Sequence, residues 1–111
     1  MALSGCGSAD PKPLELAQQH CDSGKVGTQV ADDKKTLIIR AVDPTSTSLT
    51  VPELACILAE LKTTSAVVSH IEMTSALDGR QEDHWGKYKA FWTYHSDRGL
   101  NMTIQENTEE A

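Results

Sequence analysis

The chain has 111 residues, of which 39% are hydrophobic and 23% are charged, and its formal net charge is −6. A chain of this length can bury one hydrophobic core, so we expect a single domain. Its ten Lys and Arg residues are scattered among sixteen Asp and Glu residues. Because no basic stripe is present to neutralise phosphates, a nucleic-acid partner is disfavoured. The sequence contains no run of about 18 apolar residues, so no membrane-spanning helix is predicted.

The residues Leu3-Ser4-Gly5-Cys6 match the site at which a bacterial signal peptidase cuts before a cysteine that receives lipid. The stretch that follows, residues 7–13, is small, polar and contains proline, which is typical of a flexible tether. Only Met1 and Ala2 precede the motif, whereas a signal peptide needs a basic region and an apolar region there. Lipidation of Cys6 therefore requires a start further upstream or a shortened chain, and the alternative is an unmodified thiol.

The first predicted element is a short helix over residues 14–22, ended by Gly24. Its apolar residues recur at spacings of three and four and share one face: Leu14, Ala17 and Cys21. A β-hairpin follows, with strands at residues 26–31 and 35–42. A polar break rich in turn formers separates the two strands: Asp32, Asp33 and Lys34. Residues 43–48 predict a surface loop.

The second predicted helix has the clearest start signal. Thr50 can cap its first turn, and Glu53, three positions later, can complete a capping box. An apolar stripe then continues to about Lys62 and consists of Leu54, Ile57, Leu58 and Leu61. Cys56 points about 160° away from the centre of this stripe. Burial of Cys56 therefore requires a second element against that flank of the helix.

The first helix can cover this flank through Cys21, which predicts a Cys21–Cys56 disulfide. Such a cross-link should stabilise a small domain by roughly 2–4 kcal/mol. It also accounts for the odd number of cysteines, three in all, because lipid on Cys6 would leave the other two to pair. The pairing requires an oxidising export compartment, whereas in the cytosol both residues would be buried thiols.

The C-terminal half predicts a third helix followed by three strands. Residues 65–77 have helical spacing, although the β-branched pair Val67-Val68 suits a strand equally well. The strands at residues 80–85, 88–95 and 100–106 predict an antiparallel meander with a two-residue turn after its first strand. Alternation predicts that the last two strands turn one apolar face to the helices: Tyr88, Ala90, Trp92, Tyr94, Leu100, Met102 and Ile104.

These elements predict an α+β fold in which two or three helices pack on an antiparallel β-sheet with a C-terminal meander and one disulfide. The predicted organisation has three parts. Residues 1–13 hold the lipidation motif and the tether, residues 14–106 form the single domain, and residues 107–111 form a disordered acidic tail.

The sequence contains few candidates for chemistry. Its four histidines are His20, His70, His84 and His95. Their spacing does not suggest a metal site, so neither a metal nor another cofactor is predicted. Glu82 and His84 would share one strand face and could act as an acid–base pair. A solvated strand edge explains this polar run more simply, because exposed charged residues are the rule.

The aromatic residues predict a candidate partner surface. With Trp92 and both tyrosines in the core, three residues are left to form an exposed patch: Trp85, Phe91 and His95. The alternative is that helices cover both faces of the sheet and bury all of these side chains.

Several groups of residues carry a family resemblance: residues 3–6, residues 30–37, the helix around Cys56, residues 67–70 and 74–81, and residues 92–95 and 97–100. In these segments, which extend over most of residues 3–106, the chain resembles the small cysteine-anchored lipoproteins encoded in actinobacteria and their phages. The resemblance implies export and a lipid anchor at the outer face of the cell membrane, and it implies no established activity. Two residues depart from the pattern, because Gly is expected in place of Lys34 and a small polar residue in place of Phe91.

Together these observations favour a non-catalytic, membrane-anchored extracytoplasmic module that binds another surface protein. One version is a lipoprotein from a resident phage that excludes a second phage. Two alternatives remain: a secreted inhibitor of an extracellular hydrolase, and a small enzyme that uses Glu82 and His84. The expected partners are the membrane, through lipidated Cys6, and a surface protein, with no nucleic acid and no cofactor.

Overall fold

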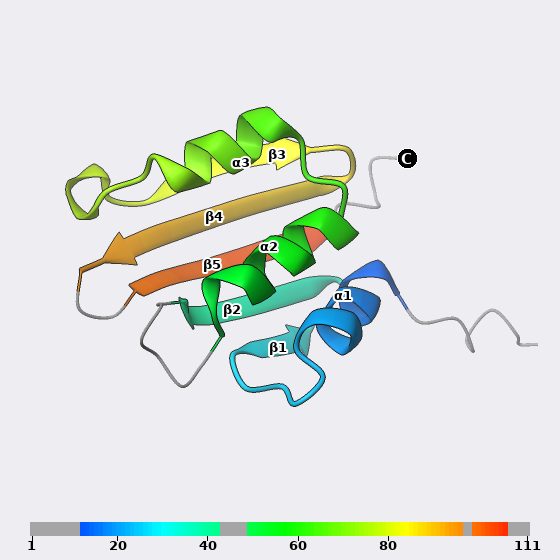
Figure 1. The fold of residues 1–111 in the computed structure, drawn as a ribbon. Helices are drawn as coiled ribbons and strands as arrows, with labels where there is room; N and C mark the ends of the chain where they lie inside the picture. Colours follow the sequence, from blue (N-terminus) through cyan, green and yellow to red (C-terminus); the bar gives the residue numbers. More distant parts are fainter. Residues whose placement is uncertain (1–11, 43–48, 97–98, 107–111) are drawn as a thin grey trace, which may run out of the picture.

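The computed structural model describes residues 12–42, 49–96 and 99–106 (Figure 1). Along the chain the elements are α1 (Pro13–Cys21), β1 (Thr28–Ala31), β2 (Thr36–Val42), α2 (Val51–Glu60), α3 (Ser65–Glu72), the short 3₁₀-helix η2 (Ala76–Asp78), β3 (Gln81–Trp85), β4 (Tyr88–His95) and β5 (Gly99–Glu106). Cys6, the predicted loop at 43–48 and the predicted tail at 107–111 lie outside the described residues. None of the described helices is long and apolar enough to cross a bilayer.

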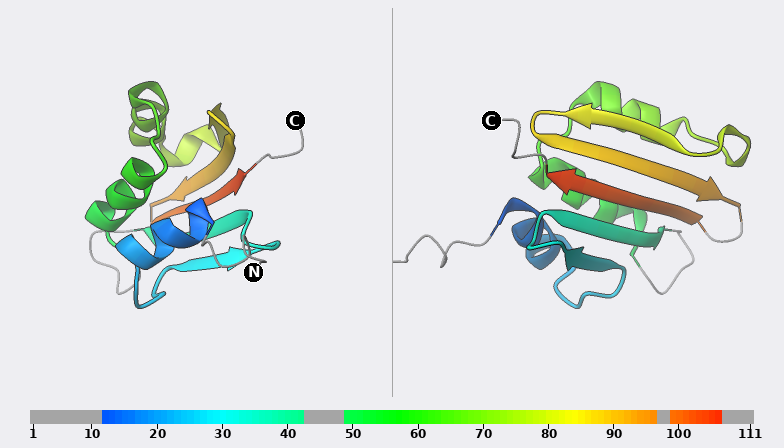
Figure 2. Two further views of the ribbon diagram at one scale, coloured as in Figure 1. Left: turned by 90° about the vertical axis from the view of Figure 1, so that its right-hand side faces the viewer. Right: turned by 180° about the vertical axis from the view of Figure 1, so that it is seen from behind.

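The five strands form one antiparallel sheet with the order β1-β2-β5-β4-β3. β5 lies in the centre because the chain passes from β2 through α2 and α3 to the edge strand β3 and then returns by hairpins. The three α-helices cover one face of the sheet, and no described element covers the other (Figure 1 and Figure 2). The predicted α+β fold with a C-terminal meander is therefore confirmed, and the described helices all lie on one face of the sheet.

The core lies between the helices and the sheet. The strands turn alternate residues toward the helices, as the two-residue period of a pleated strand requires. The largest fully buried side chains are Trp92, Leu14, Leu37, Ile39, Leu49, Ile57, Met102 and Ile104. Gly27 passes so close to this core that a Cβ on it would lie 2.7 Å from the Cβ of Leu49. A residue without a side chain is therefore needed at that crossing.

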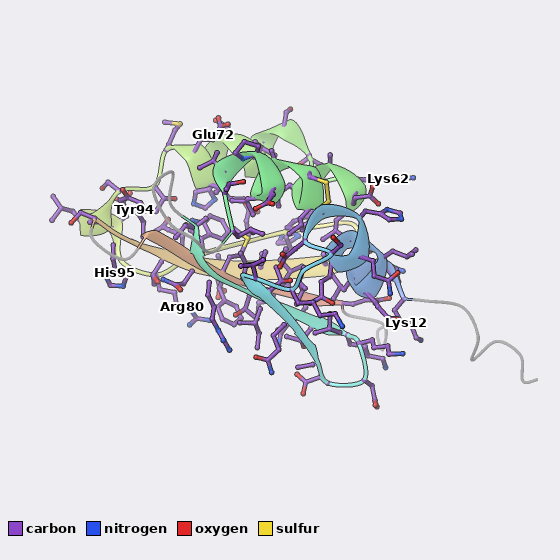
Figure 3. The ribbon with its side chains drawn as sticks, turned by 60° about the horizontal axis from the view of Figure 1, so that its bottom comes forward. Lys12, Lys62, Glu72, Arg80, Tyr94 and His95 are labelled. Atoms are coloured by element: carbon purple, nitrogen blue, oxygen red, sulfur yellow. A yellow bond between two sulfur atoms is a disulfide. The ribbon has the colours of Figure 1, made fainter. Side chains whose placement is uncertain are left out.

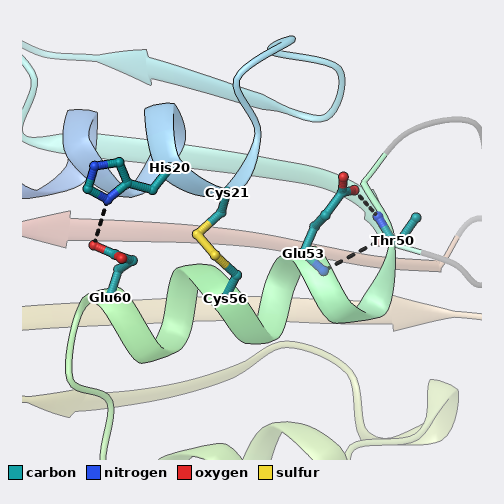
Figure 4. Close-up of a disulfide and its surroundings, with 6 residues drawn as sticks. All are labelled: His20, Cys21, Thr50, Glu53, Cys56 and Glu60. Atoms are coloured by element: carbon teal, nitrogen blue, oxygen red, sulfur yellow. Dashed lines mark hydrogen bonds and ion pairs between the residues drawn. A yellow bond between two sulfur atoms is a disulfide. The ribbon is translucent and has the colours of Figure 1, made fainter.

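Capping threonines precede α2 and α3. At α2, Thr50 Oγ1 accepts a hydrogen bond from the Glu53 N–H over 3.3 Å, and Glu53 Oε1 accepts one from the Thr50 N–H over 2.8 Å (Figure 4). These two bonds form the predicted capping box. At α3, Thr64 Oγ1 accepts from the Val67 N–H over 3.4 Å.

α3 is shorter than the helix predicted over residues 65–77, because it ends at Glu72. The Thr74 hydroxyl donates to the carbonyl oxygen of His70 over 2.8 Å, and Ser75 adopts an extended backbone before η2. Ser and Thr offer the backbone such alternative hydrogen bonds and therefore favour helix ends. The Val67-Val68 pair lies in the helix, with Val67 buried against the core.

A disulfide joins α1 to α2, as predicted. The Cα atoms of Cys21 and Cys56 lie 5.7 Å apart (Figure 4). Cys21 belongs to the buried residues of α1, and Cys56 lies on the flank of α2 that faces α1. His20 Nδ1 and Glu60 Oε1 make an exposed contact of 3.2 Å between the same two helices. The first helix therefore covers the flank of α2 that lies away from the apolar stripe.

The β1–β2 hairpin turns where the sequence predicted. Asp32, Asp33 and Lys34 all have positive φ angles, of 54°, 58° and 68°. The Lys35 N–H donates to the carbonyl of Asp32 over 3.1 Å, and the Thr36 hydroxyl donates to the carboxylate of Asp32 over 2.9 Å. Lys34 thus adopts the left-handed backbone that glycine adopts most readily.

Candidate functional site

The candidate site lies on the face of the sheet away from the helices, which we call the open face. Paired residues of neighbouring strands lie on the same face of a sheet. Phe91, Thr103 and Ile38 are paired in turn across β4, β5 and β2. The row continues to Glu82 on β3 and to Gln29 on β1. One row therefore crosses all five strands, with an aromatic and an aliphatic side chain, each partly buried, near its centre.

A shallow depression of about 380 Å³ lies along this row, and Arg40 and Arg80 both line it. The guanidinium carbon of Arg80 lies 4.3 Å from the centroid of the Phe91 ring, which is a cation–π contact. Arg40 Nη2 donates to Gln29 Oε1 over 2.8 Å. Figure 3 shows Arg80 on the side of the sheet opposite the helices. Neighbouring side chains therefore hold both guanidinium groups at this surface.

The two sides of the molecule differ in charge. The three α-helices contain no Lys or Arg and have four acidic residues, Glu15, Glu53, Glu60 and Glu72. Along the strands of the open face the described charged side chains are Arg40, Lys89 and Glu82, and Arg80 lies directly before β3. At the hairpin end of the sheet, the carboxylate of Asp32 accepts from Thr36, which lies on the same face. The open face is therefore basic in a chain whose net charge is −6. In the sequence these cations look scattered, because only the strand register brings them to one face.

The predicted exposed patch of Trp85, Phe91 and His95 does not form as a unit. Phe91 and His95 alternate along β4 and lie partly exposed on the open face. Trp85 is only 5% exposed and faces the helices, where its indole N–H donates to the carbonyl of Leu61 over 3.1 Å. The expectation for Trp85 was wrong because the two-residue turn pairs it with Tyr88, and paired residues share a face.

Glu82 and His84 share the open face of β3 and are exposed. They line a depression of about 770 Å³ together with Lys87 and Lys89. Neither side chain has a hydrogen-bond partner among the described residues. A general acid–base pair must hold its proton-transferring atoms within reach of a substrate. Two exposed side chains without described hydrogen-bond partners on an edge strand do not favour acid–base catalysis.

A second polar cluster, which the sequence did not predict, lies where α3 meets β3. His70 Nδ1 lies 2.9 Å from Asp83 Oδ2, and His70 Nε2 lies 3.0 Å from Gln81 Oε1. The amide nitrogen of Gln81 donates to the carbonyl of Asp78 over 2.9 Å, which orients the amide oxygen toward the ring. Both ring nitrogens therefore face acceptors, and both donate when the imidazole is protonated.

These contacts favour the charged forms of His70 and Asp83. The hydrogen bond to Asp83 raises the pKa of His70 above its usual value, and the bond to Gln81 raises it further. The same bond from His70 lowers the pKa of Asp83, and the N–H of His84, 2.8 Å from the carboxylate, lowers it further. An imidazolium–carboxylate pair therefore joins α3 to the edge strand at mildly acidic pH.

The same cluster packs against the buried indole of Trp92. The rings of His70 and Trp92 meet edge to face with their centroids 4.8 Å apart, and the Trp92 N–H donates to Thr74 Oγ1 over 2.9 Å. Because both nitrogens of His70 are occupied, none is left to activate a nucleophile or bind a metal. Over residues 12–42, 49–96 and 99–106, no three His, Cys, Asp or Glu side chains are grouped as metal ligands.

One signal for the His70 cluster was present in the sequence. β3 has polar residues at every position from Gln81 to His84, so two of them must face the helices whichever way the strand is turned. Gln81 and Asp83 are those residues, as their pairing with Trp92 and Ala90 shows. Polar groups turned inward need hydrogen-bond partners, and His70 supplies them.

Comparison of the chain with models of protein families, with curated proteins and with solved structures found no match. No relative therefore supplies a function by analogy. The function must be inferred from the open face, the disulfide and the chemistry of the residues themselves.

Proposed function

We propose that this protein is a non-catalytic interaction module, held at the outer face of a cell membrane by lipid on Cys6, that binds another surface protein. The open face supports this proposal best. Phe91 and Ile38 flank the central residue of its main row, Thr103, and Arg40 and Arg80 line the depression along that row. Aromatic and arginine side chains are enriched where proteins bind one another.

The remainder of the domain suits a binding scaffold. The helical layer behind the sheet is cross-linked by the Cys21–Cys56 disulfide, and binding groups on strands are positioned more rigidly than groups on loops. An antiparallel sheet can leave one face in water without loss of the fold. The module can therefore be stable alone and still present a preformed surface to its partner.

The disulfide also supports a location outside the cytoplasm, because such bonds form and persist in oxidising compartments. With Cys21 and Cys56 joined, Cys6 is the remaining cysteine of the three. A bacterial lipoprotein cysteine carries two or three acyl chains, and stable membrane attachment requires more than one chain. Lipid on Cys6 would therefore be a sufficient anchor.

Site-specific photocrosslinking tests the binding surface. A benzoylphenylalanine is placed at Thr93, which is partly exposed on the open face, and in a matched variant at Ala66, which is exposed on α3. After irradiation of intact cells, the Thr93 variant should give one adduct of defined mass and the Ala66 variant should give none. Equal labelling from both positions, or no adduct from Thr93, would contradict a partner on the open face.

The anchor is tested separately by the mass and location of the mature protein. Native protein should carry acyl groups on Cys6 and one disulfide, and Cys6→Ala should move the protein from the membrane fraction to the medium. A native mass that corresponds to three unmodified thiols would contradict both the anchor and the proposed compartment.

One version of this function, suggested by the family resemblance, is exclusion of a second phage from a cell that already carries one. Expression of the protein in a sensitive host should lower the plating efficiency of that phage. Thr93→Arg on the open face should abolish the protection, whereas Ala66→Arg on α3 should preserve it. Loss of protection in the α3 variant alone would assign the effect to the other side of the molecule.

A further inference from the structure

Two arginines line a single depression on the open face. Arg80 places its guanidinium over the ring of Phe91, and its N–H groups donate to no described residue. Arg40 uses one nitrogen on Gln29, although a guanidinium has five N–H donors. Both arginines therefore keep unused N–H donors at this surface, and such donors suit an anionic ligand.

A carboxylate on a protein segment suits this depression better than a nucleic acid or a membrane surface. Two arginines match the planar, two-oxygen geometry of a carboxylate, and Thr93 and Thr103 line the same depression. A nucleic acid or an anionic membrane surface would be repelled by the net charge of −6. The apolar atoms of Phe91 and Ile38 beside the arginines suit a protein segment that carries both an acid and apolar side chains.

We infer that the partner protein lays an acidic segment across the open face and places one Asp or Glu carboxylate in the depression that Arg40 and Arg80 line. This inference rests on the proposed function and specifies the chemistry of the partner. Glu82 ends the same row on β3 and repels a second acid there, so the segment is acidic at one point rather than along its whole length.

The test uses the full chain with its disulfide formed and two synthetic nine-residue peptides. Both peptides alternate Val and Thr, and they differ only at the central residue, which is Glu in one and Gln in the other. In amide NMR titrations, the Glu peptide should shift the signals of Phe91, Thr93 and Thr103. It should bind about tenfold more tightly than the Gln peptide, because a charged acceptor strengthens hydrogen bonds from arginine.

Variants assign the effect to the two arginines. Arg40→Gln and Arg80→Gln should each weaken binding of the Glu peptide about tenfold and reduce its advantage over the Gln peptide. Lys62→Gln removes a cation on the helical side and should leave both affinities unchanged. The NMR spectrum of each variant also shows directly whether the fold is retained.

Several outcomes would overturn the inference. Equal affinity for the two peptides would show that no carboxylate is recognised. The same conclusion would follow if neither arginine substitution changed the affinity for the Glu peptide. If the amide signals of the open face shifted with protein concentration in the absence of peptide, the surface would instead bind a second copy of the chain. Stronger peptide binding after joint replacement of Glu109 and Glu110 by Gln would assign it to the chain's own acidic end. If the two peptides bind with equal affinity while the Thr93 variant still gives its crosslink, the inferred carboxylate ligand is wrong and the proposed function stands.

Discussion

Replacing Asp83 by Asn should lower the pKa of His70 and remove stability at mildly acidic pH. Asn has the same size as Asp but carries no charge. In the native protein the pKa of His70 is raised, chiefly by its hydrogen bond to Asp83, so the folded chain binds the His70 proton more tightly than the unfolded chain. This contribution to stability is fully present below the ordinary pKa of 6.5, and it is lost as pH rises through the folded-state value.

The carboxylate sets the lower limit of the same pH window. The pKa of Asp83 is lowered from 3.8, chiefly by the hydrogen bond from His70. Its contribution is therefore present above pH 3.8 and is lost as pH falls through the lower folded-state value. The side chains of His70 and Asp83 are 35% and 31% exposed, so solvent screens the pair. We therefore expect a loss of about 0.5–1 kcal/mol for Asp83→Asn between about pH 4 and 6.5.

Urea unfolding at about pH 5.5 and pH 8.5 measures this loss. Asp83→Asn should lower the free energy of unfolding more at the lower pH, and NMR titration of the His70 ring should show its pKa moving toward 6.5. His95→Gln is a matched control, because that partly exposed ring on β4 has no described hydrogen-bond partner and does not belong to the His70 cluster. An identical pH dependence of stability in the native and Asn proteins, or a native His70 pKa below 6.5, would refute this reasoning.

Three further predictions concern stability, each measured by urea unfolding. Joint replacement of Cys21 and Cys56 by Ser should lower the free energy of unfolding by about 2–4 kcal/mol, because the long unfolded loop is no longer constrained. Lys34→Gly should raise it by about 0.5–1 kcal/mol, because Lys34 has a φ of 68° and glycine adopts this backbone without a steric cost. Gly27→Ala should lower it by about 1–3 kcal/mol, because the new Cβ would lie 2.7 Å from Leu49 Cβ.

Each of these substitutions has a control in the same chain. Cys6→Ser leaves the disulfide intact and should not change the unfolding of the domain. Lys35→Gly lies beside the hairpin turn but outside its run of positive φ angles, so it should give no gain. Gly24→Ala places its Cβ at an ordinary 3.4 Å from Val26 and should cost less than the change at Gly27. A control that matches its partner variant would show that the stated contact is not the cause.

Much of the fold could be predicted because its signals are local. Thr50 and Glu53 lie within one turn of each other, so their capping box needs no tertiary context. The Asp32 turn and the strands beside it likewise depend on neighbouring residues. The disulfide could also be predicted, because the helical period places Cys56 on the flank away from the apolar stripe. The end of the third helix could not be predicted, because the cap at Ser75 competes with an otherwise helical pattern of residues.

The candidate surface could be predicted only in part. Alternation along β4 is a local property, and it placed Phe91 and His95 opposite the core residue Trp92. The face of Trp85 depends instead on pairing with Tyr88 across the turn. Applying the predicted two-residue turn to that register would have placed Trp85 on the buried face.

The sequence by itself determined most of the elements that form, where most of them begin, and which residues of each element share a face. Only the tertiary structure decided that Arg40 and Arg80 line one depression, because the order β2-β5-β4-β3 brings their strands into one sheet. It likewise decided that His70 meets Asp83. Periodicity specifies the face on which a side chain lies, whereas the element opposite that face depends on how the whole chain packs its core.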